Sequence, residues 1–113
     1  ELEQEPGVHT DILLDIDVQG ALQVMKTLKK AVTIFILPPS LETLRTRLAG
    51  RGTDSSEEQS RRFQKSQDEM KNYSEYQYTI RNETLDQAIR ELRAVIVAER
   101  VKTAHVEPAQ VFR

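Results

Sequence analysis

Two aspartates close a short apolar run near the start of the chain, and their type and spacing suggest chemistry. The run covers residues 12–18 and contains Asp15 and Asp17. Carboxylates at the end of a buried strand are costly unless they are solvated, paired or bound to a cation. An apolar strand ending in Asp has the form of a Walker-B element, whose carboxylate helps to hold Mg²⁺ beside nucleotide phosphates. The aspartates can equally accept hydrogen bonds from loop amides, and these residues alone leave both interpretations open.

A cluster of basic side chains surrounds a glycine-containing loop in the middle of the chain. Arg47 and Arg51 lie four residues apart around an expected helix end, so both can point toward one ligand, and Arg62 lies in the next expected helix. Guanidinium groups match phosphate oxygens with parallel hydrogen bonds. The alternative is a solvated surface with helix-end contacts and ordinary ion pairs, which these residues alone favour. The cluster comprises Arg45, Arg47, Arg51, Arg61, Arg62 and Lys65.

Polar and aromatic residues near the last expected strand form a third group. Asn82 follows this strand and can read a base edge or cap the next helix, and capping is the favoured interpretation. Tyr73, Tyr76 and Tyr78 can stack on a base, but we expect them to pack between a polar helix and the sheet.

The elements that would position these residues alternate between strands and helices. Hydrophobic patterning predicts strands over 12–18, 32–37 and 76–80, and helices over 19–29, 41–49, 56–73 and from 84 onward. Ser40, Ser55 and Thr84 are expected N-caps. The order predicts an α/β fold with a parallel sheet, in which ligands bind at the carboxyl ends of the strands. The polar helix is expected to project, and the tail from about 103 to be weakly structured.

Composition narrows the possible classes of protein. The 113 residues carry a net charge of −2, contain no Cys and include two His, which argues against disulfides, thiolate metal sites and histidine metal clusters. We expect no nucleic-acid partner, because the net charge is not positive, and no membrane partner, because no apolar run is long enough to span a bilayer. A cytoplasmic location is the default interpretation. The chain begins at Glu1, which suggests that residues are missing upstream.

Four motifs taken together resemble the guanylate kinase family. They are residues 14–21 (LDIDVQGA), 34–40 (IFILPPS), 48–55 (LAGRGTDS) and 74–78 (SEYQY) followed by Asn82. The resemblance covers roughly residues 10 to 100. It implies a P-loop kinase-type parallel sheet with flanking helices and a lid, of which this chain is the C-terminal part, with the core at 10–49 and 76–101 and the lid at about 50–75.

The family catalyses ATP + GMP ⇌ ADP + GDP with Mg²⁺ bound to ATP, so the resemblance implies ATP and GMP as partners. By position, Asp15 resembles the Walker-B aspartate that holds the metal. Asp17 resembles a residue on the GMP and metal side of the cleft, and Asn82 resembles the asparagine near the adenine.

The same resemblance implies catalytic roles for three arginines. Arg47 and Arg51 resemble lid arginines that contact ATP and its phosphates, and Arg62 resembles the arginine that bridges the donor and acceptor phosphates. Their positive charge would neutralise the transition state of phosphoryl transfer.

The chain also departs from the family pattern. Residues 81–83 read Arg-Asn-Glu where the family usually shows Val-Asn-Asp, and Arg81 is unusual at an apolar strand position. None of the four glycines fits Gly-x-x-x-x-Gly-Lys-Ser/Thr, so the P-loop and the GMP-binding region that precedes Asp15 are absent. We therefore expect the isolated fragment to be inactive.

Two alternatives to a guanylate kinase stay open. The first is a non-catalytic guanylate kinase-like protein-interaction domain, against which the retained Asp15, Arg47, Arg51 and Arg62 argue. The second is a related small-molecule kinase with a different acceptor.

Overall fold

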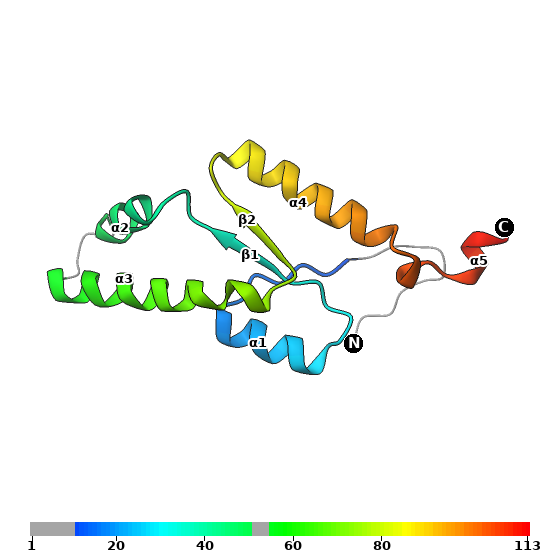
Figure 1. Cartoon of the computed structure of the whole chain (residues 1–113), viewed down its shortest axis with the longest axis horizontal. Helices are drawn as coiled ribbons and strands as arrows, with labels where there is room; N and C mark the ends of the chain where they lie inside the picture. Colours follow the sequence, from blue (N-terminus) through cyan, green and yellow to red (C-terminus); the bar gives the residue numbers. More distant parts are fainter. Residues whose placement is uncertain (1–10, 51–54) are drawn as a thin grey trace.

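The computed structural model describes residues 11–50 and 55–113. Within these residues, two strands are separated, preceded and followed by helices (Figure 1). Their bounds are α1 Val18–Thr27, β1 Ile34–Leu37, α2 Leu41–Ala49, α3 Ser56–Met70, η1 Lys71–Glu75, β2 Tyr78–Arg81, α4 Leu85–Arg100, η2 Thr103–His105 and α5 Pro108–Val111.

The sheet consists of β1 and β2, which pair in parallel. The register places Ile34 opposite Tyr78 and Leu37 opposite Arg81. The long connection between them passes through α2, α3 and η1, which extend to one side in Figure 1. The predicted α/β class and parallel pairing are therefore confirmed.

The predicted strand over 12–18 is wrong for the structure as described. Residues 11–17 have no regular secondary structure, and Val18 already belongs to α1. In Figure 1 this extended segment runs toward the same end of the molecule as the arrowhead of β1. A strand requires a backbone partner, and β1 pairs with β2, so within the described residues this segment has none. Its apolar side chains consequently stay exposed, with Leu13 at 78%.

Side chains cap the N-termini of α1 to α4. The expected caps Ser40, Ser55 and Thr84 accept hydrogen bonds from the backbone N–H groups three residues ahead, at 3.0 Å, 3.2 Å and 3.2 Å. Asp17 caps α1 in the same way. Such caps satisfy donors that the helix leaves without a partner, and this local chemistry explains why α2, α3 and α4 begin where the sequence predicted, while α1 begins one residue before its predicted start.

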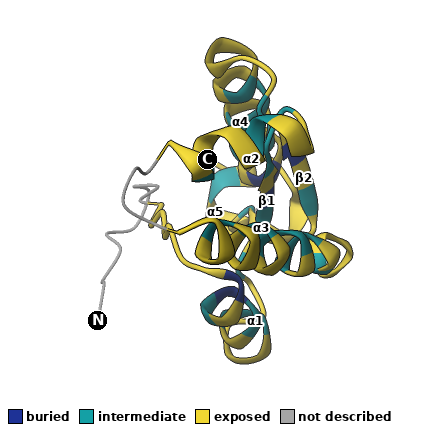
Figure 2. Cartoon of the chain, turned by 90° about the vertical axis from the view of Figure 1, so that its left-hand side faces the viewer, coloured by how far each residue is buried: buried dark blue, intermediate teal, exposed yellow. Residues whose placement is uncertain are grey.

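The core of the described residues is small. Ile80 of β2, Phe35 of β1, and Val18 and Ala21 of α1 are its buried apolar members (Figure 2). The radius of gyration is 17.9 Å and the extents are 61 × 30 × 24 Å. A compact domain of this length has a radius of gyration of about 13 Å, so the chain is elongated.

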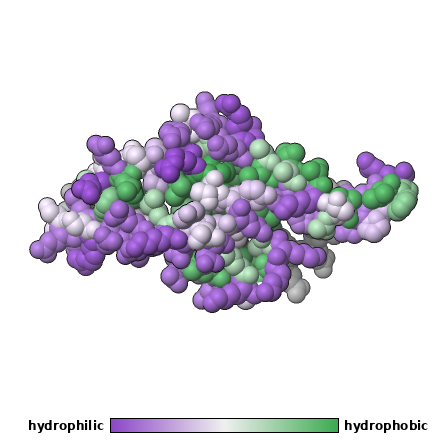
Figure 3. Space-filling view, viewed as in Figure 1, coloured by the Kyte–Doolittle hydropathy of each residue, from purple (hydrophilic) through white to green (hydrophobic). Residues whose placement is uncertain are grey.

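The helices carry much apolar surface that the described chain does not cover. Apolar side chains gather over the C-terminal part of α4 and over α5, at the upper right and right of Figure 3. Val97, Val101 and Phe112 are 58%, 71% and 85% exposed. No helix in the described part of the chain is both long and apolar enough to cross a membrane.

The polar helix and the tail differ in how well they were predicted. α3 buries no residue, as its thin apolar stripe indicated, and its last turn tightens into the 3₁₀ helix η1. The tail is more regular than predicted, because η2 and α5 form there. A capping box between Glu107 and Gln110, with Pro108 at the first helical position, starts α5.

Candidate functional site

The carboxyl ends of β1 and β2 lie side by side and form one edge of the sheet. The backbone N–H of Asn82 donates to the carbonyl of Leu37 at 2.8 Å, which extends the ladder by one step. The side chain of Asn82 is half-buried. The helix that follows is capped by Thr84, so capping by Asn82, the favoured interpretation from sequence, is wrong. Its amide therefore sits at the edge where ligands bind in sheets of this class.

Asp17 has a structural function in the fold. One of its carboxylate oxygens accepts a hydrogen bond from the N–H of Gly20 at 2.8 Å. The carboxylate also complements the positive end of the α1 dipole. Because that bond occupies one lone pair of one oxygen, the other oxygen can still receive a ligand.

The negative charge of Asp17 affects the pKa of Tyr76, which lies in the segment leading into β2. Burial is the main cause that raises the pKa of Tyr76, and the charges of Asp17 and Glu69 raise it further. The Tyr76 ring also packs edge-on against Phe35, with centroids 4.8 Å apart and planes at 87°. Asp17 is thus held near the sheet on the side of Tyr76, whereas Asn82 lies past the opposite end of β2. No hydrogen bond between described residues joins Asp17 to Asn82.

Asp15 lies in the extended segment and its side chain is exposed. The described residues contain no group of three His, Cys, Asp or Glu that could hold a metal ion. Mg²⁺, however, is commonly held by one or two carboxylates, with substrate phosphates and waters completing its octahedron. An exposed carboxylate two residues from a second one fits that requirement and falls short of a complete protein cage.

The arginine-bearing helices α2 and α3 contact each other through a cation–π pair. The guanidinium of Arg45 lies 4.5 Å from the centroid of the Phe63 ring. Arg47, two residues further on, is rotated by about 200° around the helix and so lies on the side of α2 away from this contact. Arg62 is exposed on α3 beside Phe63 in sequence. Arg51 falls outside the described residues, and the phosphate-binding roles of all three arginines stay predictions.

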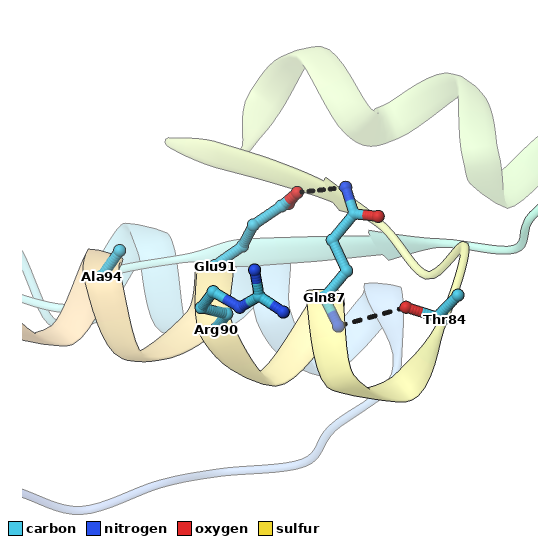
Figure 4. Close-up of a pocket in the computed structure, with 5 residues that line it drawn as sticks. All are labelled: Thr84, Gln87, Arg90, Glu91 and Ala94. Carbon is cyan, nitrogen blue, oxygen red and sulfur yellow. Dashed lines mark hydrogen bonds between the residues drawn. The ribbon is translucent and has the colours of Figure 1, made fainter.

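Two shallow hollows are among those that indent the surface of the described residues. One, of about 500 Å³, lies on one face of α4 between Thr84 and Ala94 (Figure 4). Gln87 in this hollow already bonds Glu91 at 3.2 Å, and none of the predicted site residues lines it. The other, of about 540 Å³, lies under the crossover and is lined by Leu37, Leu41, Gln67, Met70, Lys71, Tyr73, Thr79 and Arg81.

The guanylate kinase family model matches residues 3–99. The chain belongs to the guanylate kinase family. It is 47% identical to a guanylate kinase of Chromohalobacter salexigens over 86% of this chain and 45% of the relative. A guanylate kinase of Nitrosospira multiformis is 51% identical over 83% of this chain and 45% of the relative. One of Geobacter sulfurreducens is 45% identical over 93% of this chain and 52% of the relative. The chain spans about half the length of the curated relatives that it matches.

Family membership confirms the predicted resemblance and the fold class as a partial guanylate kinase domain. It leaves the division into a core at 10–49 and 76–101 and a lid at about 50–75 as a prediction. The roles of Asp15, Asp17, Arg47, Arg62 and Asn82 also stay predictions.

The sequence interpretation missed a polar cluster at the far end of α4. The buried carboxylate of Glu99 accepts hydrogen bonds from the Tyr78 hydroxyl and, at 2.8 Å, from the Lys102 ammonium. The bond to Lys102, and then that to Tyr78, lowers the pKa of Glu99. Nδ1 of His105 donates to the Glu99 carbonyl at 2.6 Å. These contacts connect β2 and η2 to α4. The one sequence signal for them was the spacing of Glu99 and Lys102, three residues apart, which allows an ion pair along a helix.

The prediction that the tyrosines pack between the polar helix and the sheet fits Tyr76 but not Tyr78, whose hydroxyl bonds a residue of α4. Tyr76 packs on Phe35, and Tyr78 bonds Glu99. Tyr73 is 51% exposed and lines the hollow under the crossover.

Proposed function

We propose that this chain is the C-terminal part of a guanylate kinase that transfers the terminal phosphoryl group of ATP to GMP, giving ADP and GDP. The observation that carries the proposal is the family match over residues 3–99, a span that contains every predicted site residue. The wide crossover between β1 and β2 supports it, since this crossover carries the arginines that such a reaction requires.

The aspartates would serve the metal side of the site. We assign Asp15 as the carboxylate that holds Mg²⁺ together with ATP phosphates, because its side chain is exposed. Bound there, the ion would neutralise charge on the phosphates. Asp17 would contribute its second oxygen on the GMP side while its first oxygen caps α1.

The arginines would serve the phosphate side. Phosphoryl transfer depends mainly on positioning and on neutralising charge spread over the equatorial oxygens. Arg47 and Arg62 lie on the crossover helices, which bury no residue, and Arg51 follows α2 in sequence. A segment held by so few packing contacts can close over nucleotides and exclude water. Asn82, at the carboxyl edge of the sheet, would contact the adenine.

The isolated chain is expected to have negligible turnover. Its sequence contains no Gly-x-x-x-x-Gly-Lys-Ser/Thr loop to cradle the donor phosphates. A cytoplasmic location, without nucleic-acid or membrane partners, belongs to the same proposal.

A coupled assay of ADP release tests the proposal. The intact gene product that contains this chain is incubated with ATP, Mg²⁺ and either GMP or AMP. We expect GMP-selective turnover that falls by about 100-fold or more in Arg47→Ala, Arg62→Ala and Asp15→Asn. The control is Arg93→Gln, which removes an exposed cation from α4 and should leave turnover unchanged.

The assay also separates the competing functions. AMP-selective turnover, or turnover indifferent to the arginine variants, would contradict the assignment. A folded full-length product without turnover would favour the protein-interaction domain instead.

A further inference from the structure

Arg81 is a charged residue at the carboxyl end of β2. It is the last residue of β2, opposite Leu37 of β1, and its side chain is exposed. Its guanidinium brings five N–H donors to this end of the sheet.

Two of the contacts of Arg81 lie beyond the end of the backbone ladder. Its Nη1 donates to the carbonyl of Pro38 at 3.0 Å and to that of Pro39 at 3.2 Å. The last ladder bond runs from Asn82 N–H to Leu37, so the guanidinium extends the link between the two strands by two residues.

These two carbonyls lie at the base of α2. Ser40 follows directly, and its hydroxyl caps the helix through the N–H of Thr43 at 3.0 Å. α2 itself buries no residue, so packing holds its direction only weakly. A planar guanidinium that bridges two successive carbonyls therefore restrains how the helix leaves the sheet.

We infer that Arg81 is a positioning residue that sets the direction of α2 and, through it, the place of Arg47. Arg47 lies seven residues beyond Ser40, which is about 10 Å along the helix axis. A tilt of about 20° at the base would move it by about 4 Å. Displacements of about 1 Å can already cost about 100-fold in rate, so such a tilt matters to a residue that binds phosphate. The functional half of this inference rests on the proposed phosphate-binding function of Arg47.

The first test measures the helix direction without any reference to activity. The chain contains no cysteine, so Ala49→Cys on α2 and Ala94→Cys on α4, both at exposed positions, allow one pair of spin labels in the full chain. Electron–electron distance measurements should give a narrow distribution with Arg81, a broad or displaced one with Arg81→Val, and an intermediate one with Arg81→Lys. Arg93→Gln on α4 is the matched control and should reproduce the parent distribution.

Hydrogen exchange shows whether the sheet survives the substitution. Protection of the Asn82 amide should persist in Arg81→Val, since its bond to Leu37 involves backbone atoms only. An unchanged label distribution with an intact sheet would overturn the inference. So would a broadening that Arg93→Gln shares.

The second test uses the intact gene product. If the reaction is as proposed, Arg81→Val should lower kcat by about tenfold or more while the KM for GMP stays constant, and Arg81→Lys should restore part of the loss. Unchanged kcat in an active protein with a displaced α2 would overturn the link to Arg47. A parent protein without turnover would contradict the proposed function, and the label distances would then decide the positioning inference.

Discussion

Asp17 combines a structural and a proposed functional contribution, and two substitutions separate them. Asp17→Asn keeps an oxygen that can accept the hydrogen bond from Gly20 but removes the negative charge. Asp17→Ala removes both. A property that depends on the capping hydrogen bond should change in Asp17→Ala alone. A property that depends on the negative charge should change in both Asp17→Ala and Asp17→Asn.

The expected loss of stability follows from the cap geometry. Replacing a capping Asp by Ala costs about 1 kcal/mol, and the lost attraction between its charge and the dipole of an exposed helix adds about 0.5 kcal/mol. Asn caps about as well as Asp, so Asp17→Asn should lose only the second contribution. With a urea slope of about 2 kcal/mol/M, the midpoint of unfolding should fall by about 0.75 M in Asp17→Ala and by about 0.25 M in Asp17→Asn.

The charge has its own readout in the ionisation of Tyr76. Because the carboxylate of Asp17 contributes to the raised pKa of Tyr76, both variants should lower that pKa, while burial keeps it above the ordinary value of 10.0. Ultraviolet titration of the phenolate in a Tyr73→Phe, Tyr78→Phe background isolates Tyr76. In the intact gene product, both variants should lower turnover with Mg²⁺, ATP and GMP.

Three outcomes would refute this reasoning. Equal destabilisation by both substitutions would show that the oxygen does not cap α1. An unchanged pKa of Tyr76 would show that Asp17 does not lie near it. Full turnover in Asp17→Asn would remove Asp17 from the proposed site, whatever its effect on stability.

Further predictions concern the core, the polar cluster and the crossover. Ile80→Ala should destabilise the chain by about 3 kcal/mol, because Ile80 is 3% exposed. Ile36→Ala should cost clearly less, because Ile36, the register partner of Ile80, is 50% exposed. Urea unfolding measures both losses, and equal losses would contradict the burial pattern. The pKa of Glu99 is lowered in the folded state, so the stabilisation by its carboxylate is fully present above about pH 4.5 and is lost as the pH falls through the folded-state pKa. Glu99→Gln should therefore reduce the loss of unfolding free energy between neutral and acidic pH. An unchanged loss in this variant would argue against the contribution of Glu99. Arg45→Gln should weaken the contact with Phe63 by about 0.5 to 1 kcal/mol and increase hydrogen exchange in α2. Arg45→Lys keeps the positive charge and should retain part of the contact. Unchanged exchange in both variants would show that the ring contact does not hold α2 and α3 together.

The parts of the fold that were predictable are those whose causes are local. Ser40, Ser55 and Thr84 cap helices through hydrogen bonds that span three residues, so the sequence contains both partners. The parallel pairing of β1 with β2 followed from the alternation of elements. The edge residues were found for the same reason, since Asn82 directly follows a strand.

The segment with Asp15 shows where local pattern fails. Its apolar run has the composition of a buried strand, but strand formation depends on hydrogen bonds to another segment, which no window of sequence contains. The described chain offers it no such partner, and Asp15 and Asp17 therefore stand at the end of an extended segment.

Arg81 is a second residue whose contacts a local sequence pattern could not predict. Read as one residue in a strand, it contradicts the apolar pattern and suggests an exposed edge. Its bonds to Pro38 and Pro39 cross more than 40 positions in sequence and exist only because β1 and β2 pair in parallel with Leu37 opposite Arg81. The pairing brings the guanidinium to carbonyls whose own residues follow the end of β1, at the point where the crossover begins. An anomaly in the strand pattern thus became interpretable once the register was known, and it lies at the base of the helix that carries Arg47.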